Sequence, residues 1–435
     1  MDHLYHHDKI EIDIKKSKKE KQTQKSKKEK GELYERVQRP AVVVKKLETI
    51  VSHLISERGL ESQASTVQVG LDNGQDLLKM TLTVKDSDNL PKSHKKMKYE
   101  EGYCPPSNLL SSVKRLLIIG AVQAPETYFN IRSLMNKIDV QGIKYAISAD
   151  IKMYLILLGK QSASCTHPCP FCTGTKSWTK EFSDNTIGSL NDNYQSVLSS
   201  GADLKEANRY QNVTSQPLIS GDPETRIEDI MTLPELHIMT GITGKLVEEL
   251  ERNAFSSKEE GEKFTNSWMS SHTPQISRCV YQGSASFKGN MARLLVKSSR
   301  NLFESLSSLE DEIVDRGTPF VMAISLFNDV LDACFGQDLK PDYKEKIASF
   351  MTVYRSLNIT IPLKVHLLEH HVPKILDKRM EQGYNTGLGF LSEQSMEAAH
   401  YDFNNEWEKV KVPITHPKYG EKLLSTITRY NAKHT

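Results

Sequence analysis

Two cysteines three positions apart carry the clearest chemical signal in this sequence. Cys169 and Cys172 form a Cys-Pro-Phe-Cys motif, which supplies half of a tetrahedral site, because a structural zinc ion takes four protein ligands. Three of the six cysteines lie within eight residues, a clustering that in an intracellular chain indicates metal binding rather than disulfides. Cys165 and His167, close to this pair, could also be ligands, but the preferred interpretation of Cys165 is a small buried thiol. Two more ligands must come from elsewhere in the chain.

Histidines that could complete the site gather in the stretch VHLLEHHVPKIL, residues 365–376. The stretch offers His366, His370 and His371. The first of them lies 194 residues after the second cysteine of the motif, far more than in a zinc finger. This spacing predicts a metal ion that joins the two ends of a large insertion.

The same histidines permit a second interpretation. His366-Leu-Leu-Glu369-His370 fits the H-x-x-E-H pattern of zinc metalloproteases, in which a glutamate acts as general base beside two histidines of one helical face. Pro373 counts against it, because proline disfavours α geometry in the preceding residue, so the helix is expected to end or kink just after His371. A protease would also leave the cysteine pair without partners. Histidines exposed at a helix end are a third interpretation.

The region before the cysteines predicts alternating strands and helices, which is typical of an α/β domain with a mixed sheet. Apolar and polar residues alternate on both sides of an Asp-Asn-Gly turn, and two further apolar runs follow. The predicted strands are 65–71, 78–84, 113–122 and 143–150, and the predicted helices are 125–138 and 151–161.

Two aspartates stand at the ends of predicted strands. Asp72 lies at the turn after the first strand and Asp150 at the end of the last. In a ribonuclease H-like sheet these two strands are neighbours, so both carboxylates would meet at one edge. A third carboxylate is expected on a later helix. The stretch 392–409 begins with a good N-cap serine and offers Glu393 and Glu397, one turn apart on one face.

Together these features resemble the catalytic core shared by Transib transposases and the catalytic subunit of the V(D)J recombinase. The resemblance covers roughly residues 60–430 and implies a ribonuclease H-like domain with an Asp-Asp-Glu triad and a zinc-binding helical insertion. The family's first aspartate opens a short motif that matches Asp72-Asn-Gly-Gln-Asp76. Its second precedes the first zinc cysteine by 19 positions, as Asp150 precedes Cys169.

The resemblance also selects among the open ligands. The family's histidine pair is spaced by five and runs into Val-Pro, which chooses His366 and His371 over His370. Its glutamate lies in a helix led by Ser-Glu, which favours Glu397 over its rival Glu393. The stretches LPELHIMTGIT (233–243) and FKGNMARLL (287–295) are also similar to the family. The second contains a Gly-Asn-x-x-Arg element, whose Arg293 would contact DNA phosphate or form a structural ion pair.

The implied activity is that of a DDE-type DNA transposase and endonuclease. Three carboxylates, Asp72, Asp150 and Glu397, would hold two Mg²⁺ (or Mn²⁺) ions, because these ions prefer oxygen ligands. The enzyme would nick DNA by hydrolysis and then join strands by attack of the 3′-OH. Zinc would be structural and would fix the insertion against the core. The implied partners are double-stranded DNA, a second copy of the chain in a homodimer and an accessory subunit.

The predicted architecture is α/β plus an all-α insertion: a ribonuclease H-like mixed sheet interrupted by a large helical zinc-binding segment. Its parts are a disordered basic tail (1–31), a helical pre-catalytic segment (32–64), the sheet core with both aspartates (65–162), the helical insertion (163–385) and a C-terminal helix with the glutamate (386–435).

Composition places the chain among globular proteins without a membrane span. Apolar residues make up 38% and charged residues 26%, no apolar run reaches the roughly 18 residues of a transmembrane helix, and no secretory signal is expected. Residues 15–30 hold nine lysines and two glutamates, which predicts a nuclear import signal or a DNA-backbone arm, and hence a nuclear protein, against a plain solubilising tail. Only about 60 residues precede the first core strand, where the family carries DNA-end-binding and dimerisation segments. A truncated or domesticated transposon remnant that binds DNA without cutting it is therefore the alternative.

Overall fold

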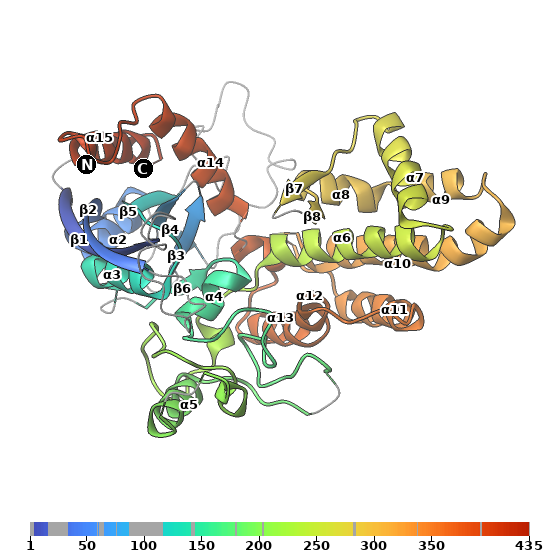
Figure 1. Ribbon diagram of the computed structural model, residues 1–435, viewed down its shortest axis with the longest axis horizontal. Coiled ribbons are helices and arrows are strands. Elements are labelled where there is room, and N and C mark those ends of the chain that lie inside the picture. The colour runs from blue at the N-terminus through green and yellow to red at the C-terminus, as the bar shows by residue number, and fades with distance from the viewer. Residues whose placement is uncertain are drawn as a thin grey trace, which may run out of the picture. The chain divides into compact units, whose positions relative to one another are not determined.

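The computed structural model describes residues 4–15, 34–58, 60, 65–74, 76–86, 116–140, 144–178, 181–201, 204–281, 284–336, 338–391 and 394–434. The chain has a mixed α/β fold that divides into two compact units. The first comprises residues 1–170, 184–232 and 393–435, and the second comprises 171–183 and 233–392. Figure 1 labels the elements of both.

A six-stranded sheet forms the centre of the first unit. Its order is β1-β2-β5-β4-β3-β6, and every neighbouring pair is antiparallel except β3 and β6, which are parallel. The central strands are buried along almost their whole length, because the sheet is covered on both faces. The strands are β1 (Tyr5–Lys15), β2 (Tyr34–Val44), β3 (Ser65–Gly74), β4 (Leu77–Asp86), β5 (Leu117–Gln123) and β6 (Ala146–Ser148).

Helices cover the two faces of this sheet (Figure 1). A Cβ atom on Gly120 of β5 would overlap Ile138 of α3, so α3 packs on that face. The opposite face meets α14, because Lys79 of β4 bonds to Asn404 of that helix. The helices of this unit are α2 (Leu47–Glu57), α3 (Tyr128–Ile138), α4 (Ile151–Leu157), α5 (Ile187–Ser199), α14 (Gln394–Glu408) and α15 (Tyr419–Ala432), with the short turns η5 (Ala207–Tyr210) and η6 (Ile227–Asp229).

The second unit is mainly helical. The long helix α10 contacts α6, α8, α9 and α11, and its inward residues are apolar and buried. The elements are α6 (Glu235–Asn253), α7 (Lys258–Ser271), β7 (Cys279–Tyr281), β8 (Ser284–Ser286), α8 (Gly289–Lys297), α9 (Ser299–Leu306), α10 (Asp311–Cys334), α11 (Tyr343–Ser356), α12 (Leu363–His366), η7 (Leu367–His371), α13 (Val372–Glu381) and η8 (Leu388–Leu391).

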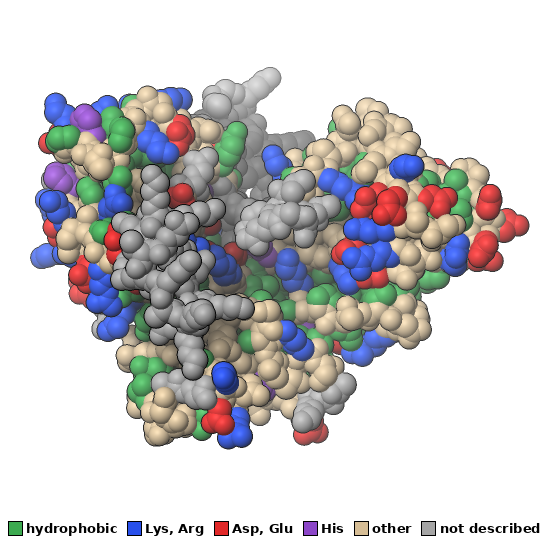
Figure 2. All heavy atoms as spheres, viewed as in Figure 1, with side chains coloured by type: hydrophobic (Ala, Val, Ile, Leu, Met, Phe, Trp, Pro, Cys, Tyr) green, Lys and Arg blue, Asp and Glu red, His purple; other side chains and the backbone are tan. Residues whose placement is uncertain are grey.

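Charged side chains of both signs lie side by side at the end of this unit that carries α7 and α9 (Figure 2). They include pairs four residues apart on one helix, such as Lys258 with Glu262 and Arg300 with Glu304. Such exposed pairs each stabilise a helix by a few tenths of a kcal/mol at most, about 0.3–0.5. This face is therefore a solvated helix surface rather than a uniformly basic one.

The predicted strands and helices between residues 65 and 161 are present as β3 to β6, α3 and α4. The N-terminal predictions were partly wrong. Residues 5–15 of the supposed tail form β1, and 34–44 of the supposed helical segment form β2, leaving a helix only at 47–57. The apolar run Ala41–Val44 is buried between β1 and β5, and a run of that length cannot be assigned to a helix or a strand by periodicity.

The boundaries of the insertion also differ from the prediction. Residues 184–232 group with the sheet unit and not with the helical unit, and the helical unit contains the hairpin β7–β8. Most of the lysine-rich stretch, residues 16–30, lies outside the described residues. Its first lysine, Lys15, ends β1 opposite Tyr34 of β2.

Candidate carboxylate site and metal centre

The parallel pair β3–β6 determines where the two predicted aspartates lie. Gln68 is opposite Ala146 and Gly70 is opposite Ser148. Asp72 and Asp150 each follow the last of these pairs by two residues, Asp72 within β3 and Asp150 just beyond the end of β6. The turn of the β3–β4 hairpin comes later than predicted, so Asp72 lies within β3 and not at the turn.

Asp150 also caps a helix. It is the N-cap residue of α4, and its Oδ1 accepts a hydrogen bond of 2.7 Å from the backbone N–H of Met153. This bond fixes the orientation of the carboxylate and involves only one of its two oxygens.

The helix α14, which includes position 397, contacts β3, the strand of Asp72. Positions 397, 400 and 404 share one face of the helix, because they are three and four residues apart. From that face His400 donates a hydrogen bond through Nδ1 to Asp72 Oδ2. The backbone of Glu397 lies in α14, whereas its side chain and the whole of Glu393 lie outside what the structure describes.

The contact between α14 and β3 is close. A Cβ atom on Gly70 would overlap the sulfur of Met396, so this strand position accepts the helix only because it lacks a side chain. Helix α14 therefore has a defined distance and rotation relative to β3.

Asp72 is ionised under ordinary conditions. Burial alone would raise the pKa of its carboxyl, but the charge and hydrogen bond of His400, together with the charge of Lys79, lower this pKa to about 2. Its side chain is 43% exposed, so the carboxylate has access to solvent and to a bound ion.

Sequence reasoning missed three groups near these aspartates. Lys79 is fully buried at the β4 position opposite Asp72, and burial lowers its pKa to about 8 although the Asp72 charge acts in the opposite direction. Glu126 forms an ion pair with Lys152. The pKa of Glu126 is raised by burial first, and then by the charges of Asp150 and Asp72.

Glu126 is therefore a further carboxylate within electrostatic reach of both aspartates. Glu126 lies between β5 and α3. The sequence pattern that indicated Asp150, an acidic residue just after a buried strand, could therefore have indicated Glu126 as well. His400, the third missed group, gave no such signal. Its contact with Asp72 joins residues 328 positions apart.

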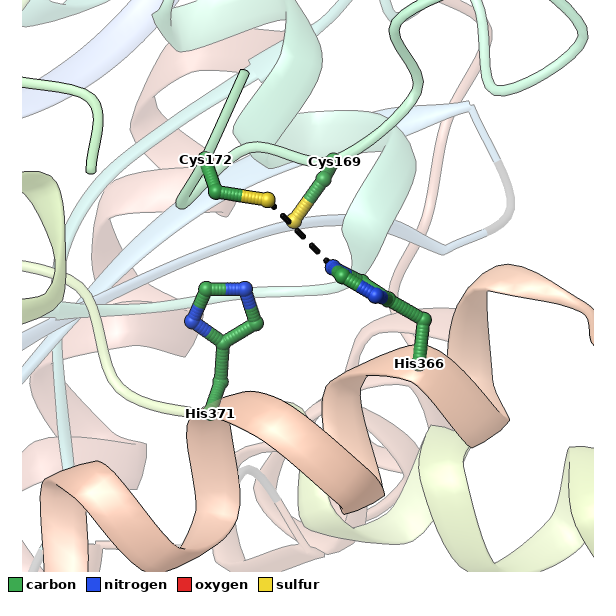
Figure 3. A group of neighbouring side chains, drawn as sticks. All are labelled: Cys169, Cys172, His366 and His371. Atoms are coloured by element: carbon green, nitrogen blue, oxygen red, sulfur yellow. Dashed lines mark hydrogen bonds between the residues drawn. The ribbon is translucent and has the colours of Figure 1, made fainter. Parts of the chain in front are cut away.

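The predicted zinc ligands do come together. Cys169, Cys172, His366 and His371 are all buried, and one donor atom from each lies within 4.8 Å of the others. The cysteine sulfurs point toward the two imidazoles, which rise from one helical segment (Figure 3). Cys172 Sγ is 3.3 Å from His366 Nε2. This donor set and spacing can bind a metal ion such as zinc.

A π-helical turn explains why the histidines are five residues apart. In an α-helix, residues i and i+5 point in different directions, whereas a π-turn closes with i to i+5 hydrogen bonds and brings them onto one face. The turn η7 spans Leu367–His371, and Pro373, which lacks an N–H group for an α-helical bond, follows two residues after its end. The predicted disturbance at Pro373 is thus a change from π to α geometry at Val372, after which the helix continues.

The metalloprotease pattern does not match this geometry. The cluster contains His371 and not His370, so its histidine spacing is five and not four. Glu369 accepts hydrogen bonds of 2.6 and 2.9 Å from Arg355. Burial would raise the pKa of Glu369, but His370 and Arg355 lower it to about 2, which disfavours a role as general base.

Aromatic rings enclose the cluster. Trp178 stacks on His366 with ring centroids 3.8 Å apart, and its Nε1 donates a 2.8 Å hydrogen bond to the carbonyl of Ile361. Phe182 packs against the rings of His366 and His371. Burial lowers the pKa of His366, which favours the neutral imidazole that a metal requires.

Hydrogen bonds that involve the backbone hold the cysteine loop in place. The N–H of Gly174 donates to Cys172 Sγ over 3.4 Å, and Lys160 Nζ donates to the carbonyl of Cys169 over 2.8 Å. Such outer contacts orient the ligands before a metal arrives.

Arg293 is engaged inside the helical unit. Its guanidinium lies 3.5 Å from the buried carboxylate of Glu235 and donates to the carbonyl of Phe335 over 3.4 Å. Of the two predicted roles, the structural ion pair is the one that these contacts support.

No protein-family model matches the chain, and no curated protein matches it. In the part of the chain that the structure describes, no helix has both the length and the apolar character needed to cross a membrane.

Proposed function

We propose that this protein is a DDE-type DNA transposase and endonuclease with a ribonuclease H-like core. The observation that supports this best is the parallel pairing of β3 and β6, which ends with Gly70 opposite Ser148, two residues before Asp72 and Asp150, together with the bond from His400 of the Glu397 helix to Asp72. A ribonuclease H-like sheet likewise has its two aspartate strands side by side.

The donor chemistry of this edge fits divalent magnesium. Asp72 is ionised and partly exposed, and the helix cap involves only one oxygen of Asp150. Asp72, Asp150 and Glu397 would hold the ions, with Glu126 as a nearby additional carboxylate. When bound, two such ions activate the attacking oxygen and stabilise the leaving oxygen.

The reaction begins with water. Its oxygen attacks a phosphodiester, forms a new P–O bond and displaces the 3′ oxygen, which leaves a 5′ phosphate and a free 3′-OH. That hydroxyl then attacks a second phosphodiester, forms a new P–O bond and displaces the 3′ oxygen of that phosphodiester as a new 3′-OH, which joins the two strands. In this chain, His400 would keep the Asp72 carboxylate oriented throughout both steps.

The Cys₂His₂ cluster would hold a structural zinc ion, because four protein ligands leave no open position for a substrate. The proposed partners are double-stranded DNA, a second copy of the chain and an accessory subunit, and the proposed location is the nucleus. The lysine-rich residues 15–30 would contribute nuclear import or contacts to the DNA backbone.

Cleavage of pre-nicked DNA by the full chain in Mg²⁺ or Mn²⁺ tests this proposal. Glu397→Gln should reduce the rate at least about 10³-fold, as expected for loss of a group that stabilises the transition state. Two matched controls, Glu393→Gln and the partly exposed Glu406→Gln of α14, should stay within about twofold of the wild-type rate.

The other outcomes are equally informative. A protein that binds DNA but does not cut it in either ion would be the inactive remnant. Loss of cleavage in Glu393→Gln alone would move the third carboxylate to Glu393. Cleavage that is indifferent to both substitutions would exclude α14 as the source of a catalytic carboxylate.

A further inference from the structure

A lysine lies inside the sheet unit where the strand pattern calls for an apolar residue. Lys79 is 0% exposed, and its neighbours in β4, Leu78 and Met80, are equally buried. It is the register partner of Asp72 and therefore shares a sheet face with it. A buried ammonium group costs considerable desolvation free energy, which methionine at this position would not.

The surroundings of Lys79 bring three polar groups to one point. Around the position that a Cβ atom on Gly74 would take, Asp72 Oδ2 lies at 3.4 Å, Lys79 Nζ at 3.7 Å and Asn404 Nδ2 at 3.4 Å. Lys79 Nζ donates to Asn404 Oδ1 over 3.2 Å and to the carbonyl of Gly74 over 3.4 Å. Both of these acceptors are neutral, so Asp72 supplies the negative charge.

Helix α14 is joined to the β3–β4 hairpin through two of its residues, one turn apart. Asn404 accepts from Lys79, and His400 donates to Asp72. His400 Nε2 is buried and has no hydrogen-bond partner among the described residues, a cost that leucine would not carry. Neither Lys79 nor His400 is therefore the side chain that stability alone would select.

We propose that Lys79 is a built-in cation of the carboxylate site and that Lys79, His400 and Asn404 are positioning residues, which hold Asp72 and the Glu397 helix in the metal-binding arrangement. This inference rests on the proposed function. Two opposite effects of Lys79 follow from it. The positive charge of Lys79 beside Asp72 weakens the binding of a divalent cation. The hydrogen bonds of Lys79 keep the site in its reactive geometry.

The two effects of Lys79 can be separated. Loss of its charge should tighten Mn²⁺ binding, because a unit charge a few ångströms away repels the ion. Loss of its hydrogen bonds should lower the rate, because small displacements of catalytic groups reduce turnover. If Lys79 only supported the fold, its substitution would weaken both Mn²⁺ binding and turnover.

The experiment measures Mn²⁺ binding to the full chain by electron paramagnetic resonance, alongside cleavage of pre-nicked DNA. Lys79→Gln, which keeps polar contacts without charge, should bind Mn²⁺ about tenfold tighter and lose about tenfold in rate. Lys79→Met should bind Mn²⁺ equally tightly and be slower still. The control Lys85→Gln removes the same charge about 20 Å away along β4 and should change neither value.

A second pair of variants tests His400 if the lysine variants do not fold. Asparagine places an amide N–H near the position of the histidine Nδ1, whereas leucine has similar size and no donor. His400→Leu should weaken Mn²⁺ binding about tenfold, and His400→Asn should restore it to within about threefold of wild type. Equal Mn²⁺ affinities in the two variants would overturn the positioning role of His400.

The arms distinguish this inference from the proposed function. The wild type could bind Mn²⁺ in a way that Asp150→Asn abolishes and yet not cleave DNA. This result would overturn the proposed function, but the Mn²⁺ affinities of the Lys79 and His400 variants could still be compared. Wild-type cleavage together with unchanged Mn²⁺ affinity in Lys79→Gln would overturn the inference alone. Absence of any Asp150-dependent Mn²⁺ binding would overturn both.

Discussion

The Cys₂His₂ cluster and the carboxylate edge differ in how complete a set of metal-ligand side chains the protein provides. At the Cys₂His₂ cluster all four donors are present, buried and within 4.8 Å of one another. At the carboxylate edge, Asp72 is 43% exposed and bonded to His400, and Asp150 is bonded to a helix N-terminus. The first arrangement suits a permanently held ion, whereas under the proposed function the second would take up ions that arrive with a substrate.

The difference also concerns the charge of the neighbours. The cysteine and histidine donors are surrounded by aromatic rings and backbone groups, which orient the ligands without competing for them. Asp72 instead has a buried lysine and a buried histidine beside it, two groups that satisfy its charge before any ion binds. Metal removal should therefore have very different consequences at the two centres.

The largest effect is expected at the cluster. Cys172→Ser, or treatment with a strong chelator, should abolish zinc binding and lower the free energy of unfolding of the helical unit by at least about 4 kcal/mol, because the ion joins residues 171–183 to the histidine helix. Zinc content by mass spectrometry and thermal unfolding would measure this. Cys165→Ser, outside the cluster, is the matched control and should retain one zinc per chain.

The histidines sharpen the same test. His371→Ala should lose the ion and His370→Ala should keep it, because only the former belongs to the cluster. The reverse result would restore the i, i+4 spacing of the protease pattern and refute the π-turn account.

The next effect is expected at Lys79 and depends on pH. Folding lowers its pKa from 10.5 to about 8, so between these values the unfolded chain binds more protons and the stability of the wild type rises with pH. Lys79→Met lacks this group. It should be more stable than the wild type below pH 8, by on the order of 3 kcal/mol, and lose that advantage above about pH 10.5.

Denaturant unfolding of both proteins from pH 7 to 11 checks this, and the difference between them cancels the titration of other groups. A Lys79→Met protein that is less stable at pH 7 would mean that the lysine supports the fold, contrary to its proposed role.

A smaller effect separates the two aspartates. Asp72→Asn should lower the free energy of unfolding by about 1–2 kcal/mol at pH 7, a figure reduced because the side chain is partly exposed. The depressed pKa of Asp72 means that its contribution is present above about pH 4 and disappears as the pH falls through 2. Asp150→Asn should change stability by less than about 0.5 kcal/mol, because asparagine caps a helix as well as aspartate.

Both aspartate variants should lose DNA cleavage, so cleavage alone does not distinguish them. The difference between their free energies of unfolding, measured with urea at pH 7 and pH 2.5, isolates the structural role of Asp72. Equal stabilities of the two variants would show that Lys79 and His400 do not depend on the Asp72 charge.

The sequence predicted those parts of the two centres that local patterns encode. The cysteine motif, the histidine stretch, the alternating strands around Asp72 and the helix that follows Asp150 are all short-range signals. The choice of His371 over His370 needed the family resemblance. Spacing rules assume α geometry, and the π-turn η7 departs from it.

What the sequence did not reveal depends on distant contacts. His400 and Asp72 are 328 residues apart, and Lys79 and Asn404 are 325 apart, so neither pair leaves a local pattern. Strand β1 has the alternation Ile10, Ile12, Ile14, but it leads directly into the lysine-rich stretch, whose composition is typical of a disordered tail.

The smallest predicted effect tests how the cluster is enclosed. Trp178→Phe keeps a ring over His366 but loses the 2.8 Å hydrogen bond to Ile361, which should cost about 1 kcal/mol. Trp268→Phe loses an equally short bond to Asn301 elsewhere in the helical unit and should cost the same in unfolding. Only Trp178→Phe should also speed zinc release to a chelator, about fivefold, since 1 kcal/mol corresponds to that factor. Equal release rates in the two variants would mean that the ring beside His366 does not retain the ion, and that retention depends on the four ligands alone.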